Sequence, residues 1–144
     1  MKKSIINSFV CVFLLAITSC NMAKTGDKSE GIKGMLTPGK WVVTTIGGKN
    51  IIADDFSRDL PNLTFTVDHK VHGNSGCNNL SGEYTTTTKG GIDLGHLAST
   101  RMACPGNGEN KFLAAINKVT HFKVKGDTLT LLNGAQEVLT FNRN

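Results

Sequence analysis

Alternating apolar and polar residues run through most of the chain, which is the pattern of half-buried β-strands. The alternation is clearest at Leu63, Phe65 and Val67, which fall on one face of an extended segment while the residues between them are polar. Further β-prone runs, bounded by glycine or asparagine turns, occur at 41–46, 49–52, 70–73, 83–88, 92–94, 121–125, 128–132 and 138–141. With 70–73 continuing the strand from residue 63, the pattern predicts about eight short antiparallel strands.

One segment changes to a helical period. Between Glu109 and Val119, apolar residues recur at positions 112, 113, 116 and 119, with lysines on the opposite side. Asn107 or Gly108 is a suitable N-cap, and Glu109 suits the positive end of a helix. Together these patterns predict a mainly β fold: a small antiparallel barrel or curled sheet of about eight strands with one α-helix.

The predicted strands flank a segment rich in glycine and asparagine, from Gly73 to Tyr84, which we expect to be the bend between two of them. Gly76 and Gly82 permit backbone conformations that other residues avoid. Asn78 and Asn79 could form a recognition loop, or they could satisfy the backbone of a tight bend. We favour the second interpretation because asparagine commonly makes such bonds.

Cys77 lies in this bend, and the predicted folded part contains one other cysteine, Cys104. An even pair of cysteines in an exported protein favours a disulfide, which would attach the bend to the segment 100–106. Two buried, unpaired thiols are the alternative. Zinc binding is less favoured, because neither cysteine has a second cysteine or histidine at ligand spacing.

The first twenty residues predict a lipoprotein signal peptide. Lys2 and Lys3 precede a mostly apolar stretch, 5–17, that is too short to span a bilayer. The sequence Ile-Thr-Ser-Cys that ends at Cys20 is similar to a lipobox, so we expect fatty acyl groups such as palmitate on Cys20. An ordinary secretory signal, with Cys20 as a free thiol, is the alternative. Residues 21–36 are polar and predict a flexible tether to a folded domain at 37–144.

Charge and composition argue against nucleic-acid binding. Of 16 basic residues, Lys2 and Lys3 would leave with the signal, so 14 would remain against 11 acidic residues. The remaining basic residues are scattered, and only one tryptophan and one tyrosine are available for stacking.

No catalytic residue, metal or cofactor is predicted. The segment around Ser75 lacks the second glycine of the nucleophile motif Gly-x-Ser-x-Gly, and no orienting acid is evident. His69 and His72 would lie on opposite faces of a strand, and we expect them, like His96 and His121, at the surface or core rim. The aspartates 54, 55 and 59 lack the glycine and distal glutamate of a calcium loop.

Several motifs together resemble the META domain, the HslJ-like family of bacterial envelope lipoproteins. The resemblance covers residues 38–142 and rests most specifically on Gly-Cys-Asn at 76–78 and Met-Ala-Cys-Pro at 102–105. The other matching positions are Trp41, Ile46–Gly48, Phe65, Val71–Ser75, Gly82, Tyr84, Thr100, Arg101, Glu109, Phe112, Leu113 and the last two strands. The resemblance implies a lipocalin-like fold in the cell envelope, and the paired cysteines fit both motifs.

The family is associated with envelope or heat-shock stress, and the resemblance supplies no catalytic residues. We therefore expect a non-catalytic, monomeric lipoprotein held to the periplasmic face of the outer membrane or to the cell surface by the lipid on Cys20. It would act through an envelope protein or ligand, with Gly76, Asn78, Asn79, Gly82, Tyr84, Thr100, Met102, Ala103 and Pro105 as family-motif or recognition-loop positions. The alternatives are an inhibitor of a lytic hydrolase and a barrel that binds a small apolar ligand.

Overall fold

The computed structural model describes residue 31, residues 34–37 and residues 39–144. The fold is mainly β, with one main α-helix and a short 3-10 helix, η1 (Ala53–Asp55). The first strands are β1 (Trp41–Ile46), β2 (Lys49–Asn50), β3 (Asn62–Phe65), β4 (Lys70–Asn74), β5 (Asn79–Glu83), β6 (Thr85–Thr86), β7 (Ile92–Asp93) and β8 (Ala98–Ser99). They are followed by helix α2 (Gly108–Ile116) and by β9 (His121–Lys125), β10 (Thr128–Asn133) and β11 (Gln136–Arg143).

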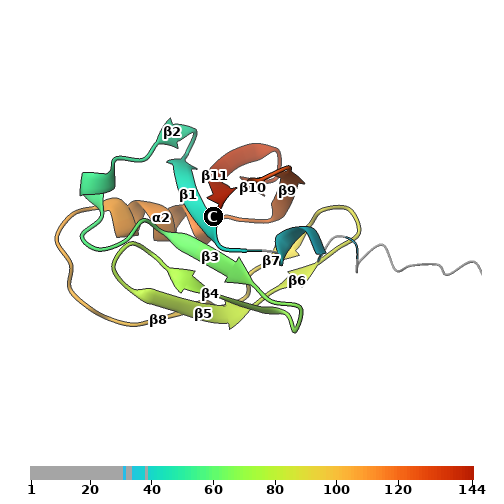
Figure 1. The fold of residues 1–144 in the computed structure, drawn as a ribbon, viewed down its shortest axis with the longest axis horizontal. Coiled ribbons are helices and arrows are strands. Elements are labelled where there is room, and N and C mark those ends of the chain that lie inside the picture. Colours follow the sequence, from blue (N-terminus) through green and yellow to red (C-terminus); the bar gives the residue numbers. More distant parts are fainter. Residues whose placement is uncertain (1–30, 32–33, 38) are drawn as a thin grey trace, which may run out of the picture.

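Nine strands form one antiparallel sheet in the order β8-β5-β4-β3-β1-β11-β10-β9, with β2 paired to β1 (Figure 1). The sheet curls strongly but stays open, because its terminal strands β8 and β9 do not pair with each other. The predicted choice between barrel and curled sheet is therefore resolved in favour of the curled sheet. The separate hairpin β6–β7 contacts β9, through one bridge between Gly91 and His121.

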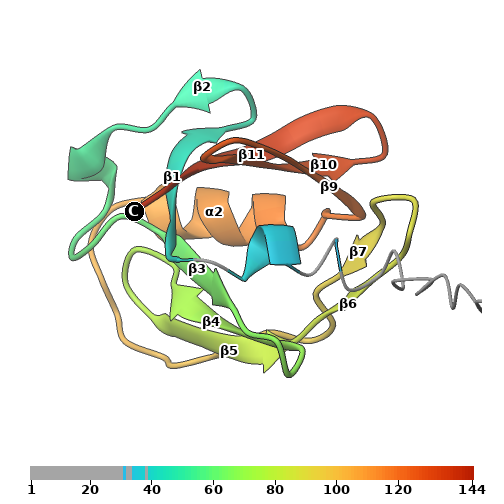
Figure 2. The same cartoon turned by 45° about the vertical axis from the view of Figure 1, so that its right-hand side comes forward.

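Helix α2 lies inside the curl, where Figure 2 shows it between β3 on one side and β10 and β11 on the other. The spacing of its apolar residues explains this position: Phe112 and Ile116 are buried, and Leu113 packs against the same core. Phe112 meets Phe141 of β11 edge to face at 6.3 Å between ring centroids. The interior of the sheet is thus filled by the helix and by large side chains such as Trp41.

Three local features differ from the predicted pattern. Val67 does not continue the buried face of β3; its side chain is 76% exposed, because the strand ends at Phe65 and a turn follows. The turn contains His69 with φ 64°, the left-handed region, and residues 70–73 return as the antiparallel strand β4 instead of continuing the strand from residue 63. The helix ends at Ile116 rather than Val119.

The folded part also begins before residue 37. Leu36, placed by the sequence pattern at the end of the tether, is fully buried in the core, and its carbonyl accepts a hydrogen bond from Trp41 Nε1 at 2.8 Å. The signal segment, Cys20 and residues 21–30 lie outside the described residues. Of the helices that are described, none has the length and apolar character needed to cross a membrane.

Candidate functional site

The bend between β4 and β5 occupies only residues 75–78, so the strands extend further into the glycine- and asparagine-rich segment than the pattern suggested. The N–H of Ser75 donates to the carbonyl of Asn78 at 2.8 Å, which closes the bend. Gly76 has φ 99°, and a Cβ there would lie 2.3 Å from the ring of Phe56. Glycine is therefore required at residue 76 both by conformation and by space.

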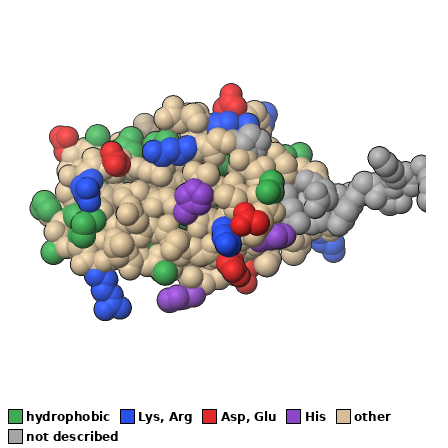
Figure 3. Space-filling model, turned by 60° about the horizontal axis from the view of Figure 1, so that its bottom comes forward, with side chains coloured by type: hydrophobic (Ala, Val, Ile, Leu, Met, Phe, Trp, Pro, Cys, Tyr) green, Lys and Arg blue, Asp and Glu red, His purple; other side chains and the backbone are tan. Residues whose placement is uncertain are grey.

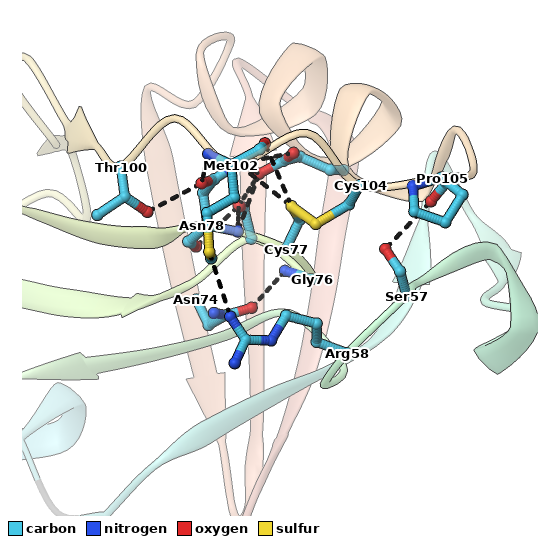
Figure 4. The surroundings of a disulfide bond; sticks show 12 residues. Ser57, Arg58, Asn74, Gly76, Cys77, Asn78, Thr100, Met102, Cys104 and Pro105 are labelled. Atoms are coloured by element: carbon cyan, nitrogen blue, oxygen red, sulfur yellow. Dashed lines mark hydrogen bonds between the residues drawn. A yellow bond between two sulfur atoms is a disulfide. The ribbon is translucent and has the colours of Figure 1, made fainter.

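A disulfide joins Cys77 of this bend to Cys104, as the sequence predicted (Figure 4). The Cα atoms are 6.0 Å apart, within the usual range for a bridge. Cys77 is buried and Cys104 half-buried. The bond fixes the segment 100–106, which we call the 100–106 loop, to the end of the sheet.

The side chain of Asn78 fastens the same loop at a second point. Its Oδ1 accepts hydrogen bonds from the backbone N–H of Met102 at 2.7 Å and from the hydroxyl of Thr100 at 2.9 Å. Its Nδ2 donates to the carbonyl of Met102 at 3.1 Å. The amide group thus pairs with both backbone groups of Met102, as a neighbouring strand would. The favoured interpretation, that Asn78 satisfies the backbone of its own bend, is therefore wrong: its side chain bonds to the backbone of another loop.

Asn78 also belongs to a polar cluster with Ser75 and Glu109, on the side away from Met102. Glu109, in the first turn of α2, accepts hydrogen bonds from the Nδ2 of Asn78 at 3.1 Å and from its backbone N–H at 3.2 Å. It also accepts one from the hydroxyl of Ser75, which is completely buried. The carboxylate therefore links the helix N-terminus to the bend and leaves Asn78 one orientation, with Oδ1 toward the loop.

The loop is held further along by Ser57, whose hydroxyl donates to the carbonyl of Pro105 at 3.1 Å. Although its backbone is fixed, the loop exposes its side chains: Met102 is 42% exposed, and Arg101 and Ala103 are also exposed. Arg58 donates to the sulfur of Met102 at 3.4 Å (Figure 4). An open groove of about 700 Å³ runs beside the loop, between residues 96–103 and the side chains of Glu109 and Leu113.

The structure brings together most of the motif positions: Gly76, Cys77, Asn78, Thr100, Met102, Ala103, Cys104 and Pro105. Asn79 is exposed at the edge of this group; its side-chain oxygen accepts a hydrogen bond from Asn74. Gly82 lies apart, under Leu97, whose side chain would be 2.8 Å from an added Cβ.

Tyr84 is also remote from the loop and belongs to the core. It is buried, contacts Phe65 edge to face at 5.1 Å, and donates its hydroxyl to the carbonyl of Thr66 at 2.9 Å. Burial, together with the charge of Asp68, raises the pKa of Tyr84 above its ordinary value of 10.0. Its role in the motif is therefore structural.

Glu109 and Ser75 match the family motifs but were not predicted to belong to the site. Glu109 was predicted to favour a helix N-terminus, and Ser75 was weighed as a nucleophile. The carboxylate of Glu109 is half-buried and needs donors, and Ser75 and Asn78 supply them. The signal that could have found the cluster is the placement of a glutamate in the first helical turn directly after the second cysteine motif.

In the part of the chain that the structure describes, no three histidine, cysteine, aspartate or glutamate side chains are grouped closely enough to hold a metal ion. The histidines are spread out: the ring of His69 contacts the carbonyl of Tyr84, and that of His121 contacts Thr120. Among the described residues, the hydroxyl of Ser75 contacts Asn78 and Glu109 and no histidine.

Residues 34–144 match the family model of the META domain. The chain belongs to the META domain family. No curated protein matches this META domain chain. The fold resembles three solved structures, each less than 25% identical, so these show the fold alone.

The first similar structure is a protein solved by NMR, with a TM-score of 0.63 and 24% identity over 77% of this chain and 93% of that one. The second is an NMR structure of a protein from Burkholderia xenovorans, with a TM-score of 0.59 and 23% identity over 80% and 88% of the two chains. The third is the crystal structure of a DUF4847 family protein from Bacteroides vulgatus, with a TM-score of 0.57 and 16% identity over 79% and 98%.

Proposed function

We propose that this META domain is a membrane-anchored binding module of the bacterial cell envelope. The lipid on Cys20 would hold it at the membrane, and the 100–106 loop would contact an envelope protein under heat or envelope stress. The observation that carries the proposal is a loop whose backbone is fixed by Asn78, by the disulfide and by Ser57, while its side chains are exposed beside an open groove. A surface fixed before binding loses little conformational entropy when a partner docks.

The buried polar cluster supports binding rather than catalysis. A nucleophilic serine needs access to substrate and a base within hydrogen-bond reach. Ser75 has no exposed surface, and its hydroxyl is engaged by Asn78 and Glu109. These residues have a complete structural role, so we assign the module no reaction.

The anchor is tested by replacing the lipid-bearing residue. Cys20→Ala in the full-length protein should move the domain from the membrane fraction to the soluble fraction of the envelope, because acyl chains contribute the membrane affinity. The disulfide between Cys77 and Cys104, checked by intact mass, reports that the released domain is still folded. Continued membrane retention of Cys20→Ala would contradict a lipid anchor.

The contact surface is tested by site-specific photocrosslinking in cells. A photoreactive residue at Arg101 should give a discrete crosslinked product, and one at Lys123, exposed on the opposite terminal strand, should not. Crosslinking at both positions alike, or at neither, would count against a binding surface at the 100–106 loop. If the crosslinked partner is a lytic hydrolase, the module is an inhibitor of that enzyme.

A separate pocket favours a second candidate function, the binding of a small apolar ligand. A partly open pocket of about 450 Å³ lies between the β1–β2 hairpin, η1 and α2, with Ile46, Ile51, Ile52 and Phe56 in its lining. The size is within the range of small-molecule sites. Native mass spectrometry of the purified protein should then show a bound apolar compound that is lost in Ile51→Asp; an unliganded mass in both proteins would exclude this candidate.

A further inference from the structure

The two terminal strands of the sheet are protected very differently. β9 carries the exposed lysines Lys123 and Lys125, and its outer edge meets the β6–β7 hairpin, with the N–H of Phe122 bonded to the carbonyl of Gly90 at 2.9 Å. Such charges and coverings normally prevent a sheet edge from pairing with another chain. The outer edge of β8 has neither a lysine nor a covering segment among the described residues.

The direction of the free backbone groups follows from the pairing of β8 with β5. The N–H of Thr100 donates to the carbonyl of Asn79 at 3.1 Å, and Ser81 lies opposite Ala98. Since hydrogen-bonded and non-hydrogen-bonded pairs alternate in an antiparallel ladder, the backbone groups of Ser99 point away from β5.

The side chain of Asn78 extends this alternation beyond the end of β8. Because it pairs with the N–H and carbonyl of Met102, these two groups point toward β5 and Asn78, as the backbone groups of residues 98 and 100 do. The N–H and carbonyl groups of Leu97 and Arg101 bond to no described residue. They then point away from β5, as those of Ser99 do. The three residues 97, 99 and 101 present a row about 13 Å long at roughly 3.3 Å per residue.

The groove of about 700 Å³ is lined by the same segment and has Leu113 of α2 in its opposite wall. Arg101 supplies a positive charge at the rim, whereas Glu109, the carboxylate in the lining, is engaged by Ser75 and Asn78. Figure 3, in which the side carrying β5 and β8 comes forward, shows acidic and basic side chains intermixed, with no extended patch of one sign. The backbone of another polypeptide can therefore approach the edge of β8 without strong repulsion, and a carboxylate on it would be favoured beside Arg101.

We propose that the β8 edge binds an extended segment of another polypeptide as an additional strand, with an acidic residue of that segment beside Arg101. The inference rests on the proposed function and names the chemistry of its partner. Backbone hydrogen bonds would supply the affinity, and Arg101 together with Leu97 and Leu113 would supply the sequence preference.

The test uses a capped octapeptide in which valine and threonine alternate around one central aspartate, titrated into ¹⁵N-labelled full-length protein. The amides of residues 97, 99 and 101 should shift and exchange with solvent more slowly. Two further peptides are N-methylated at alternate positions. In one, the methylated N–H groups are those that would face β8; in the other, they are those that would point away from it. Methylation of the N–H groups that face β8 should weaken binding about tenfold or more, because it removes hydrogen-bond donors to the edge. Methylation of the groups that point away should have little effect.

Protein variants test the same contacts. Ser99→Pro removes an outward N–H without removing a bond to β5, and it should weaken binding about fivefold or more. Arg101→Glu should weaken binding of the aspartate peptide about tenfold, and Lys123→Glu, the matched control on β9, should not. Replacing the peptide aspartate by asparagine should reproduce part of the loss in the unmodified protein.

Several results would overturn the inference: no response at residues 97–101 at millimolar peptide, equal effects of the two methylation phases, shifts at β9 instead, or self-association of the chain through β8. The crosslinking experiment distinguishes failure of the strand-addition inference from failure of the proposed binding function. A product at Arg101 without peptide binding at β8 would refute strand addition and leave the proposed function standing. Absence of both would refute both.

Discussion

Asn78→Ala removes the side chain that holds the backbone of the 100–106 loop. The side chain is 5% exposed and makes four well-formed hydrogen bonds: two with Met102, one with Thr100 and one with Glu109. Each such bond contributes a net of about 0.5–1.5 kcal/mol to stability. Thr100 and Met102 lie at the surface, where water can replace the lost partner, so we expect a loss of about 2–3 kcal/mol.

The assay is denaturant unfolding of the full-length protein with the disulfide intact. Against a total stability of roughly 5–15 kcal/mol, the expected loss is large. It corresponds to a fall in Tm of about 8–12 °C, at roughly 4 °C per kcal/mol for a domain of this size. Asn79→Ala is the matched control, because its side chain is exposed and contacts only Asn74; its cost should stay below about 0.5 kcal/mol.

A second replacement at the same position separates shape from hydrogen bonding. Asn78→Asp keeps the shape but loses the Nδ2 donors and brings a second carboxylate to Glu109, so it should destabilise more than Asn78→Ala at neutral pH. The additional loss of stability in Asn78→Asp relative to Asn78→Ala should shrink as the pH falls and one of the two neighbouring carboxylates is protonated. Equal stabilities of Asn78→Ala and Asn79→Ala would refute the role we give to this side chain.

Three further predictions concern the disulfide, the glycines and the tyrosine. Cys104→Ser should destabilise by about 3.5 kcal/mol on the chain-entropy model, measured by the same unfolding assay; a loss below 1 kcal/mol would mean that the bridge does not constrain the unfolded chain. Gly73→Ala should prevent stable folding, since its Cβ would lie 1.9 Å from the carbonyl oxygen of Asn62. Gly82→Ala should lower Tm only modestly, because its closest contact, at 2.8 Å, is the movable end of the Leu97 side chain, and the backbone oxygen of His96 lies at 3.3 Å. Near-ultraviolet circular dichroism distinguishes the two variants. Because folding raises the pKa of Tyr84, the stability that this residue contributes is intact below pH 10.0 and is lost as the pH rises through the raised pKa. Phenolate absorbance, which reports this single tyrosine, should therefore appear at higher pH in folded than in unfolded protein, and coincident titrations would contradict its burial.

The periodicity of the sequence predicted the elements whose burial it reflects. Phe112 and Ile116 marked the inner face of α2. The hairpin predicted from Asn133 and Gly134 is present, but Asn133 is the last residue of β10 and the turn residues are Gly134 and Ala135. β5 and β8 were not predicted. β5 consists largely of asparagine, serine, glycine and glutamate, which have low strand propensity, and β8 has two small residues that become a strand only by pairing with β5.

The site was predictable only as far as its covalent chemistry. The pair Cys77 and Cys104, in a domain predicted to be exported, indicated the disulfide, and the structure has it. The contacts of Asn78 with Met102 and Glu109 join residues 24 and 31 positions apart, and no local pattern specifies such pairs. Tertiary packing decides them, which is why the asparagine was expected to serve its own bend.

Amide hydrogen exchange at Met102 tests most directly whether the 100–106 loop is fixed by Asn78. The side chain of Met102 is 42% exposed, yet its N–H donates to Asn78 Oδ1 at 2.7 Å, while the N–H of neighbouring Arg101 has no acceptor among the described residues. The Met102 amide should exchange far more slowly than the Arg101 amide in the native protein, and the two should exchange alike in Asn78→Ala. Equally fast exchange of both amides in the native protein, with the disulfide intact, would contradict a fixed loop.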